Sequence, residues 1–300
     1  MQNPINVARN RIDIKRFRVP PSGRFSLANF DPADTSPFET REGARKLLAK
    51  RVHRLFELGD LLYAQSRWSV LFIFQAMDGA GKDSAIKHVL RGLDPKATQV
   101  FSFKTPSPEE LKHDFMWRCL KNLPERGRIG IFNRSYYEEV LVSRVHPELL
   151  EQRQLPACCM TPHIWRDRFE DIRDIERYLG RNGTVIRKIY LNVSKAEQRR
   201  RFLMRLHNPE KRWKFSINDI NERLRWKEYM TAYEEAMRAT TTEDAPWYVV
   251  PADNKWFTRL AVAQIAIDTL EALKLKVPTM SHHDARALNN ARRRLRFKSK

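Results

Sequence analysis

The chain of 300 residues carries a formal net charge of +20, from 56 Lys and Arg against 36 Asp and Glu. Hydrophobic residues make up 42% and glycines number only 10, which excludes a disordered or fibrous chain and suits one large α/β domain. The longest apolar runs are too short to cross a bilayer, and residues 1–20 contain no hydrophobic secretory segment. We therefore expect no membrane association.

The cysteines indicate a reducing compartment. There are three, Cys119, Cys158 and Cys159, and their spacing matches no metal site. A disulfide between adjacent residues is strained and rare, so we expect ordinary thiols and a cytoplasmic protein.

The positive charge is spread beyond the two ends of the chain. Residues 1–20 contain five Lys and Arg against one Asp, and residues 281–300 contain seven against Asp284, so residues 21–280 keep a net charge of +10. A polyanion is therefore the expected partner. Charge alone does not distinguish nucleic acid, an acidic membrane and polyphosphate.

Apolar periodicity predicts strands that alternate with helices. Five runs are typical of strands, over residues 68–74, 99–104, 128–133, 184–192 and 247–250. Helices are expected over residues 41–65, 81–90, 107–122, 195–207 and 256–273, with capping boxes at Ser107/Glu110 and Ser194/Glu197. Residues 1–40 are expected to form an extended lead-in. The alternation predicts βαβ units around a mainly parallel sheet.

A candidate phosphate loop lies between the first strand and the following helix. It reads Asp78-Gly79-Ala80-Gly81-Lys82-Asp83-Ser84. Small residues allow backbone N–H groups to converge on phosphate oxygens, and the helix N-terminus and Lys82 add positive charge.

The loop departs from the G-x-x-x-x-G-K-[ST] consensus at two positions, where Ala76 replaces Gly and Asp83 replaces Ser or Thr. A Gly-rich turn with a surface lysine is the bland alternative. The carboxylate of Asp78 beside a phosphate site calls for a neutralising cation, and Mg²⁺ is the expected ion, with Mn²⁺ as an alternative.

Polar residues also follow the strand over residues 128–133. Ligands of open parallel sheets bind at this carboxyl edge. Asn133 stands where a metal-binding Asp is usual, Arg134 can hold phosphate oxygens in a bidentate manner, and Glu138 can approach the same ion. An exposed turn with solvated charges is the alternative interpretation.

Several segments together resemble the family-2 polyphosphate kinases over residues 40–275. They are residues 75–83 and 104–108, the stretch Ile-Phe-Asn-Arg-Ser-Tyr-Tyr-Glu-Glu-Val at 131–140 with Arg-Val-His-Pro at 144–147, and residues 209–216 and 245–252. The resemblance implies a three-layer α/β/α P-loop kinase fold with a helical lid. It also implies Mg²⁺-dependent phosphoryl transfer between inorganic polyphosphate and nucleotides, in dimers or tetramers.

Matched position by position, the resemblance assigns roles to individual residues. The catalytic residues are then Asp78, Lys82, Arg134 and Arg201, with Asp78 as a metal ligand. Asn133 occupies the position of the family's second acid, and we expect Glu138 to replace it as the other metal ligand. Residues expected to bind phosphate or nucleotide are Gly79, Ala80, Gly81, Asp83, Ser84, Lys104, Asn133, Lys211 and Lys214. The form of residues 133–138 is similar to a branch that accepts nucleoside mono- and diphosphates, which would convert AMP, ADP, GMP and GDP to higher nucleotides.

The resemblance also divides the chain. Residues 41–275 would form the P-loop kinase domain with a lid around 207–220, between the lead-in of residues 1–40 and a basic C-terminal tail of residues 276–300. The lid would exclude water and suppress hydrolysis.

Two other functions stay open. An ATP-dependent nucleotide or small-molecule kinase of the same fold would explain the loop but not the charge of +10 that remains without the ends. A nucleic-acid-binding protein with a degenerate loop would need aromatic residues interleaved with Lys and Arg on an exposed strand. The aromatic residues of the expected strands fall in apolar runs, so nucleic acid is not the expected partner.

Overall fold

A five-stranded, all-parallel sheet forms the centre of the molecule, in a computed structural model that describes residues 12–90, 93–279 and 282–297. The strands are β1 (Ser69–Gln75), β2 (Thr98–Ser102), β3 (Ile129–Asn133), β4 (Thr184–Asn192) and β5 (Trp247–Pro251), in the spatial order β2-β3-β1-β4-β5. The expected α/β fold with a parallel sheet is confirmed.

The central strand β1 explains why the apolar runs form this sheet. All seven of its residues are buried, because strands pair with it on both sides and helices cover both faces. Val70 pairs with Ile129 of β3 and with Val185 of β4. The carboxyl ends of β1, β3 and β4 therefore meet at one edge of the sheet.

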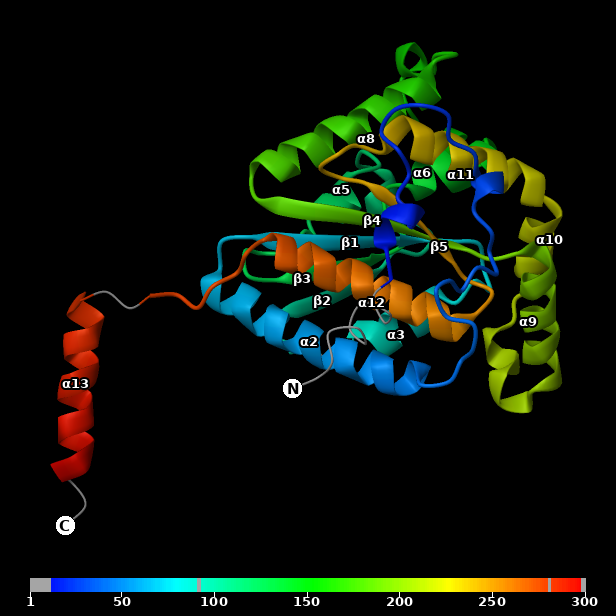
Figure 1. Ribbon diagram of the computed structural model, residues 1–300. Helices are drawn as coiled ribbons and strands as arrows, with labels where there is room; N and C mark the ends of the chain where they lie inside the picture. Colours follow the sequence, from blue (N-terminus) through cyan, green and yellow to red (C-terminus); the bar gives the residue numbers. More distant parts are fainter. Residues whose placement is uncertain (1–11, 91–92, 280–281, 298–300) are drawn as a thin grey trace.

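Helices form a layer on each face of the sheet. One layer contains α2 (Ala44–Gln65), α3 (Lys82–Leu90) and α12 (Lys255–Ala272), and the other contains α6 (Glu138–Val145), α8 (Ile164–Arg181) and α11 (Trp226–Thr240) (Figure 1). At one end of the sheet stand α9 (Lys195–His207) and α10 (Asn218–Leu224), joined through the 3₁₀ helix η4 (Pro209–Lys214). The shorter elements are η1 (Ile14–Phe17), η2 (Leu27–Asn29), α4 (Pro108–Leu111), α5 (Trp117–Leu120), α7 (Glu148–Glu151) and η3 (Ala157–Cys159).

The single helix expected over residues 107–122 is wrong. The capping box of Ser107 and Glu110 is present, but it opens only the one-turn helix α4. The carboxylate of Asp114 then accepts hydrogen bonds from the backbone N–H groups of Met116 and Trp117. This local bonding ends one helical run and begins the next, α5.

The second capping box is only half formed. The Ser194 hydroxyl accepts a hydrogen bond from the Glu197 N–H at 3.1 Å, as expected. The Ser194 N–H, however, donates to Asp253 Oδ1, and the Glu197 carboxylate binds Arg200 and Arg201 instead. Glu197 therefore forms ion pairs with two arginines of its own helix instead of completing the cap.

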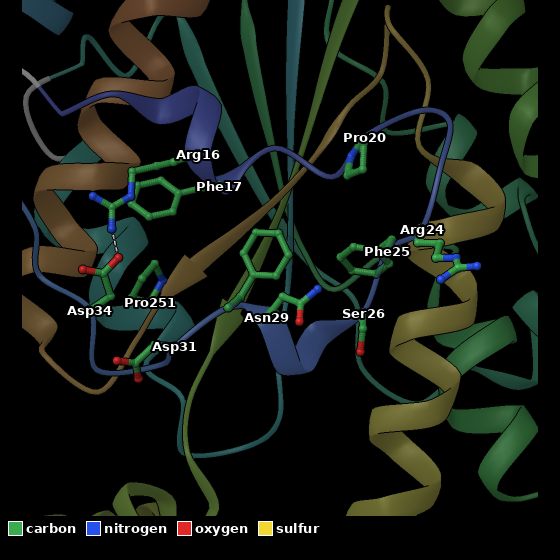
Figure 2. Close-up of a pocket in the computed structure, with 11 residues that line it drawn as sticks. Arg16, Phe17, Pro20, Arg24, Phe25, Ser26, Asn29, Asp31, Asp34 and Pro251 are labelled. Carbon is green, nitrogen blue, oxygen red and sulfur yellow. Dashed lines mark ion pairs between the residues drawn. The ribbon is translucent and has the colours of Figure 1, made fainter.

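The described part of the N-terminal lead-in packs against the sheet. Phe17 and Val19 are buried, and the Val19 N–H donates to the Trp247 carbonyl of β5 at 2.9 Å. Figure 2 shows the cavity of about 330 Å³ that this segment encloses with Pro251, where Arg16 is paired with Asp34. Residues 12–40 thus belong to the folded body.

The basic C-terminal tail contains a further helix, α13 (His282–Phe297), which projects away from the body (Figure 1). No helix in the described part of the chain is long and apolar enough to span a membrane. All three cysteines are free.

Candidate active site

The segment from Asp78 to Lys82 forms a tight loop between β1 and α3. Gly79 and Gly81 have φ values of +83° and +104°, which side chains rarely allow. Lys82 is 8% exposed and donates from Nζ to the Ala76 carbonyl at 2.7 Å, while Nζ lies 4.0 Å from Asp78 Oδ1. Burial lowers the pKa of Lys82, against the raising effect of the Asp78 charge.

The turn after β3 meets this loop through Arg134. Its backbone N–H donates to the Phe74 carbonyl of β1, and its φ of +67° is rare for a residue with a side chain. Its guanidinium lies between two carboxylates, with Nη2 at 3.0 Å from Asp78 Oδ1 and Nη1 at 3.4 Å from Glu138 Oε2. The structure therefore brings together Asp78, Lys82, Arg134 and Glu138.

These charges adjust one another's pKa values. Burial favours a higher pKa for Asp78, but the charges of Lys82 and Arg134 and the hydrogen bond from Arg134 outweigh it and lower this pKa. The pKa of Arg134 is raised, mainly by the Glu138 charge. Asp78 is thus an anion at neutral pH, on a side chain that remains 36% exposed.

The remaining residues of the loop and of the β3 end are joined in a second set of contacts. Asn133 Nδ2 donates to Asp83 Oδ1 at 2.8 Å and to Ser102 Oγ at 3.4 Å, while its buried Oδ1 has no hydrogen-bond partner among the described residues. Ser84 Oγ accepts a hydrogen bond from Arg259 of α12 at 2.9 Å. Asn133 therefore binds the loop directly, in place of the carboxylate expected at this position.

Arg201 has a different environment from the one expected for a phosphate ligand. It is 4% exposed, and its guanidinium makes five hydrogen bonds: to Glu197 and to the carbonyls of Gly79, Ala80, Ala252 and Asp253. A guanidinium carries five N–H groups, so in this arrangement none is left for a phosphate. Arg201 instead holds the phosphate loop in place through the carbonyls of Gly79 and Ala80.

A cavity of about 620 Å³ opens beside the loop and the β3 turn. Four predicted residues line it: Asp78, Lys104, Arg134 and Glu138. Lys211 does not line it and is exposed on η4, and the predicted side chain of Lys214, at the end of η4, lies outside the part that the structure describes. Of the predicted site residues whose side chains are described, none lines the smaller cavity of Figure 2.

The cavity also contains residues that the sequence analysis missed. Asp219 and Glu222 come from α10, His146 from the end of α6, and Tyr229 and Tyr233 from α11. Asp219 is close enough for the Asp78 charge to raise its pKa, in addition to the larger effect of burial. His146 lies in the segment 144–147 that carried part of the resemblance, but no role was predicted for it. No motif marks the other four residues, which only contacts between distant segments bring here.

Gln198 is another missed residue, and for this one a signal existed. It lies three residues before Arg201, so both share one face of α9. Its Nε2 donates to the Asp78 carbonyl at 2.7 Å. Because the resemblance placed Arg201 at the site, this shared face was the signal that could have placed Gln198 beside the loop.

The side chains suitable for a divalent cation are Asp78 and Glu138. Within the described ranges no group of three or more His, Cys, Asp and Glu residues is arranged around a metal site. Mg²⁺ in phosphoryl-transfer sites commonly takes only one or two carboxylates and completes its shell with water and substrate phosphates. Two partly exposed carboxylates on one cavity fit that requirement, although both now contact Arg134.

Comparison with known proteins gives matches along most of the chain. The family described as Polyphosphate kinase 2 (PPK2) matches residues 39–278. An ADP-polyphosphate phosphotransferase of Rhodopseudomonas palustris is 48% identical over 270 residues, covering 89% of this chain and 93% of the relative. An AMP/ADP-polyphosphate phosphotransferase of Meiothermus ruber is 44% identical over 266 residues, covering 88% of this chain and 96% of the relative.

A solved structure agrees with the fold. The crystal structure of Polyphosphate Kinase 2 from Arthrobacter aurescens TC1 superimposes with a TM-score of 0.82 at 40% sequence identity, covering 92% of this chain and 96% of that one. The resemblance inferred from the motifs is confirmed by both kinds of match. The chain belongs to the polyphosphate kinase 2 family.

Proposed function

We propose that this enzyme transfers phosphoryl groups between inorganic polyphosphate and nucleoside mono- and diphosphates. The observation that carries the proposal is the convergence of Asp78, Lys82 and Arg134, of which Asp78 and Arg134 line a cavity of about 620 Å³. Membership of the polyphosphate kinase 2 family supports polyphosphate as the phosphate donor. The names of the two relatives, one specifying ADP and one AMP and ADP, support acceptors of both lengths.

The cavity would hold the nucleotide, and the loop would hold the phosphates. AMP, ADP, GMP and GDP are the proposed acceptors. An oxygen of the nucleotide's last phosphate attacks the terminal phosphorus of polyphosphate, forming a new P–O bond. The bond to the rest of the polyphosphate breaks, and its electron pair leaves with the shortened chain. The attacking oxygen is already an anion at neutral pH and the leaving oxygen departs as a stable phosphate anion, so neither a general base nor a general acid is needed.

The protein's contribution is then positioning and charge. Lys82 and the amides of Gly79 and Gly81 would bind phosphate oxygens at the transfer point. Arg134 would exchange its contact with Asp78 for the charge on the transferred group, because guanidinium groups suit phosphate oxygens. The exposed cations Lys104 and Lys211 would attract the anionic substrates.

A divalent cation completes the proposed site. Asp78 and Glu138 would hold Mg²⁺, or Mn²⁺ in its place, once Arg134 turns to the phosphates. The ion supplies neutralisation of the phosphate charge where transfer occurs. The neutral side chain of Asn133 adds no charge here, so the binding rests on the other two residues.

The surroundings of the site complete the proposal. Residues 207–220 would act as a lid over the substrates, since they leave the body between α9 and α10 and include the 77% exposed Trp213. We also propose a cytoplasmic enzyme that works as a dimer or tetramer.

One assay tests the function. Purified protein is mixed with Mg²⁺, polyphosphate and each of AMP, ADP, GMP and GDP, and the higher nucleotides are quantified. Product with polyphosphate as the sole donor is expected. No product from any acceptor would contradict the proposal, and product from ATP alone would favour an ATP-dependent kinase.

Three variants test the site in the same assay. Lys82→Ala and Asp78→Ala are expected to lose activity while keeping the wild-type melting temperature. Asp174→Ala, at an exposed carboxylate on α8, is the control and is expected to stay active. Full activity in the Lys82 or Asp78 variant would show that the reaction occurs elsewhere.

A further inference from the structure

Two side chains of helix α9 donate hydrogen bonds to the backbone carbonyls of the phosphate loop. Gln198, which is 1% exposed, donates to the Asp78 carbonyl at 2.7 Å, and Arg201 donates to the carbonyls of Gly79 and Ala80 at 3.1 Å and 2.6 Å. Three consecutive carbonyls of the loop thus face one side of one helix.

The orientation of these carbonyls fixes that of the amides. In a planar trans peptide the N–H of the next residue points opposite to the C=O. The carbonyls of Asp78 and Ala80, held toward α9, therefore direct the N–H groups of Gly79 and Gly81 away from the helix. These are the amides proposed to bind phosphate. The contacts with α9 set the shape of the anion site.

The surroundings of Gly79 show that α9 packs closely against the phosphate loop. A Cβ atom on Gly79 would lie 2.8 Å from Cε1 of Phe202 and 3.2 Å from Cγ of Gln198. Both distances are too short for a Cβ atom unless Phe202 and Gln198 shift. A shift of α9 would therefore be transmitted to the loop.

Gln198 also binds α10, the helix in which the proposed lid of residues 207–220 ends. Gln198 Oε1 accepts a hydrogen bond from Nη1 of Arg223 at 2.8 Å, and this atom also donates to the Lys195 carbonyl at 2.7 Å. Arg223 lies near the end of α10, 25 residues beyond Gln198. The Arg223 guanidinium thus joins α10 to the first turns of α9, at the two ends of the segment that runs from α9 through η4 to α10.

We propose that Gln198 is a positioning residue that couples the segment of residues 207–220 to the phosphate loop. One end of its amide binds Asp78 and the other binds α10 through Arg223. When α10 is seated, the amide is fixed at both ends and the loop is held ready for phosphate. When α10 moves, the amide loses its acceptor contact and the loop loses one of its supports.

This inference rests on the proposed function, and conservative variants test it. Gln198→Glu keeps an acceptor for Arg223 but has no N–H for the Asp78 carbonyl. Gln198→Met keeps the approximate size and removes both bonds, and Arg223→Gln releases α10 alone. Gln264→Met is the matched control, because Gln264 is also buried on a helix but bonds to Asp268 of α12.

Steady-state kinetics give the first measurement. We expect kcat to fall by about 10-fold to 100-fold in both Gln198 variants, as for a small displacement of reacting groups, with a smaller change in KM for the nucleotide. The Gln198→Met/Arg223→Gln double variant should be no slower than Gln198→Met alone, because both changes break one chain of contacts. Gln264→Met should match the wild type.

Limited proteolysis gives a measurement that a merely structural role would not change. Trypsin can cut at the exposed Lys211 and Arg212 of η4, and polyphosphate with nucleotide should slow this cleavage in the wild type. In Gln198→Met the slowing should disappear while the melting temperature stays within a few degrees of the wild type.

The outcomes separate the two proposals. An inactive wild type would contradict the proposed function. An active wild type with Gln198 variants of unchanged kcat and unchanged substrate protection would overturn the coupling alone. A lowered melting temperature with unchanged kcat per folded molecule would also overturn it, by showing that Gln198 only stabilises the fold.

Discussion

Nη2 of Arg134 lies 3.0 Å from Oδ1 of Asp78, so a single ion pair joins the turn after β3 to the loop after β1. Arg134 holds this position at a positive φ, which the hydrogen bond from its N–H to β1 supports. Strained residues of this kind gather at functional sites. In the proposed mechanism this arginine would release Asp78 when phosphate binds.

Replacing Arg134 by Gln should affect both rate and pH dependence. Loss of the charge that we propose to stabilise the transferred group should lower kcat by on the order of 100-fold. The charge and hydrogen bond of Arg134 also help to lower the Asp78 pKa, so this pKa should rise in the variant and the acidic limb of kcat/KM should move to higher pH. Arg177→Gln, on the surface of α8, is the control. An unshifted acidic limb would show that Asp78 does not set it.

Gly79→Ala should destabilise the protein and impair the loop. Gly79 has a φ of +83°, and the added Cβ would meet Phe202 and Gln198. We expect a loss of about 1–2 kcal/mol in unfolding free energy, from the cost of the left-handed backbone, with the contacts adding to it. Gly180→Ala on α8 is the control, because its Cβ would have nothing within 4 Å and should raise the stability by about 0.4–1 kcal/mol. Urea denaturation measures the unfolding free energy of both variants. Equal unfolding free energies for Gly79→Ala and Gly180→Ala would contradict the argument.

The strands could be predicted from the sequence because burial on both faces leaves a direct apolar signal. The run over residues 184–192 matches β4 residue for residue. Helix α8 was not predicted, because charged residues fill most of its surface and only a narrow stripe, including Phe169 and Ile172, is buried. The break at Asp114 depends on a side chain bonding its own backbone, which periodicity does not reveal.

The candidate site likewise has features that the sequence predicted and features that it did not. The motif predicted the meeting of Asp78, Lys82, Arg134 and Glu138, since the carboxyl ends of neighbouring parallel strands must share one edge. The contacts of Arg201 with loop carbonyls could not be predicted, because they depend on how closely α9 approaches the loop. Family likeness supplied a role for Arg201, and the geometry supplied its partners.

His146→Gln should make stability less dependent on pH. Burial alone would lower the pKa of His146, but its hydrogen bonds to Glu222 of α10 and Glu148 of α7, both at 2.9 Å, outweigh this effect and the charge of Arg225 and raise the pKa. A raised pKa stabilises the fold below the unfolded value of about 6.5, and this contribution is lost as pH rises through the folded pKa.

Urea denaturation of both proteins at about pH 6 and about pH 9, on either side of the histidine titration, checks this expectation. The wild type should exceed His146→Gln in unfolding free energy most at the lower pH. His53→Gln, at an exposed histidine on α2, is the control and should show little difference at either pH. A difference that grows with pH would contradict the assignment.

Lys188→Met should be the most destabilising of these changes. Lys188 is fully buried on β4 and donates to Glu176 of α8 and to the Thr240 carbonyl. Burial lowers the pKa of Lys188 and opposes the pairing with Glu176, which raises it. Removing the lysine leaves a buried carboxylate without its cation, which costs about 3–5 kcal/mol in unfolding free energy.

The same carboxylate connects this pair to the active site. Glu176 Oε1 accepts hydrogen bonds from the hydroxyls of Tyr136 and Tyr137, both at 2.9 Å, and these residues follow Arg134 by two and three positions. Lys188→Met/Glu176→Gln should therefore recover part of the lost stability, because it removes the unpaired charge and keeps an acceptor for a tyrosine. Arg177→Met breaks a surface pair with Asp174 and should cost less than about 1 kcal/mol. If the double variant is as unstable as the sum of the single variants, the two charges do not act as a pair.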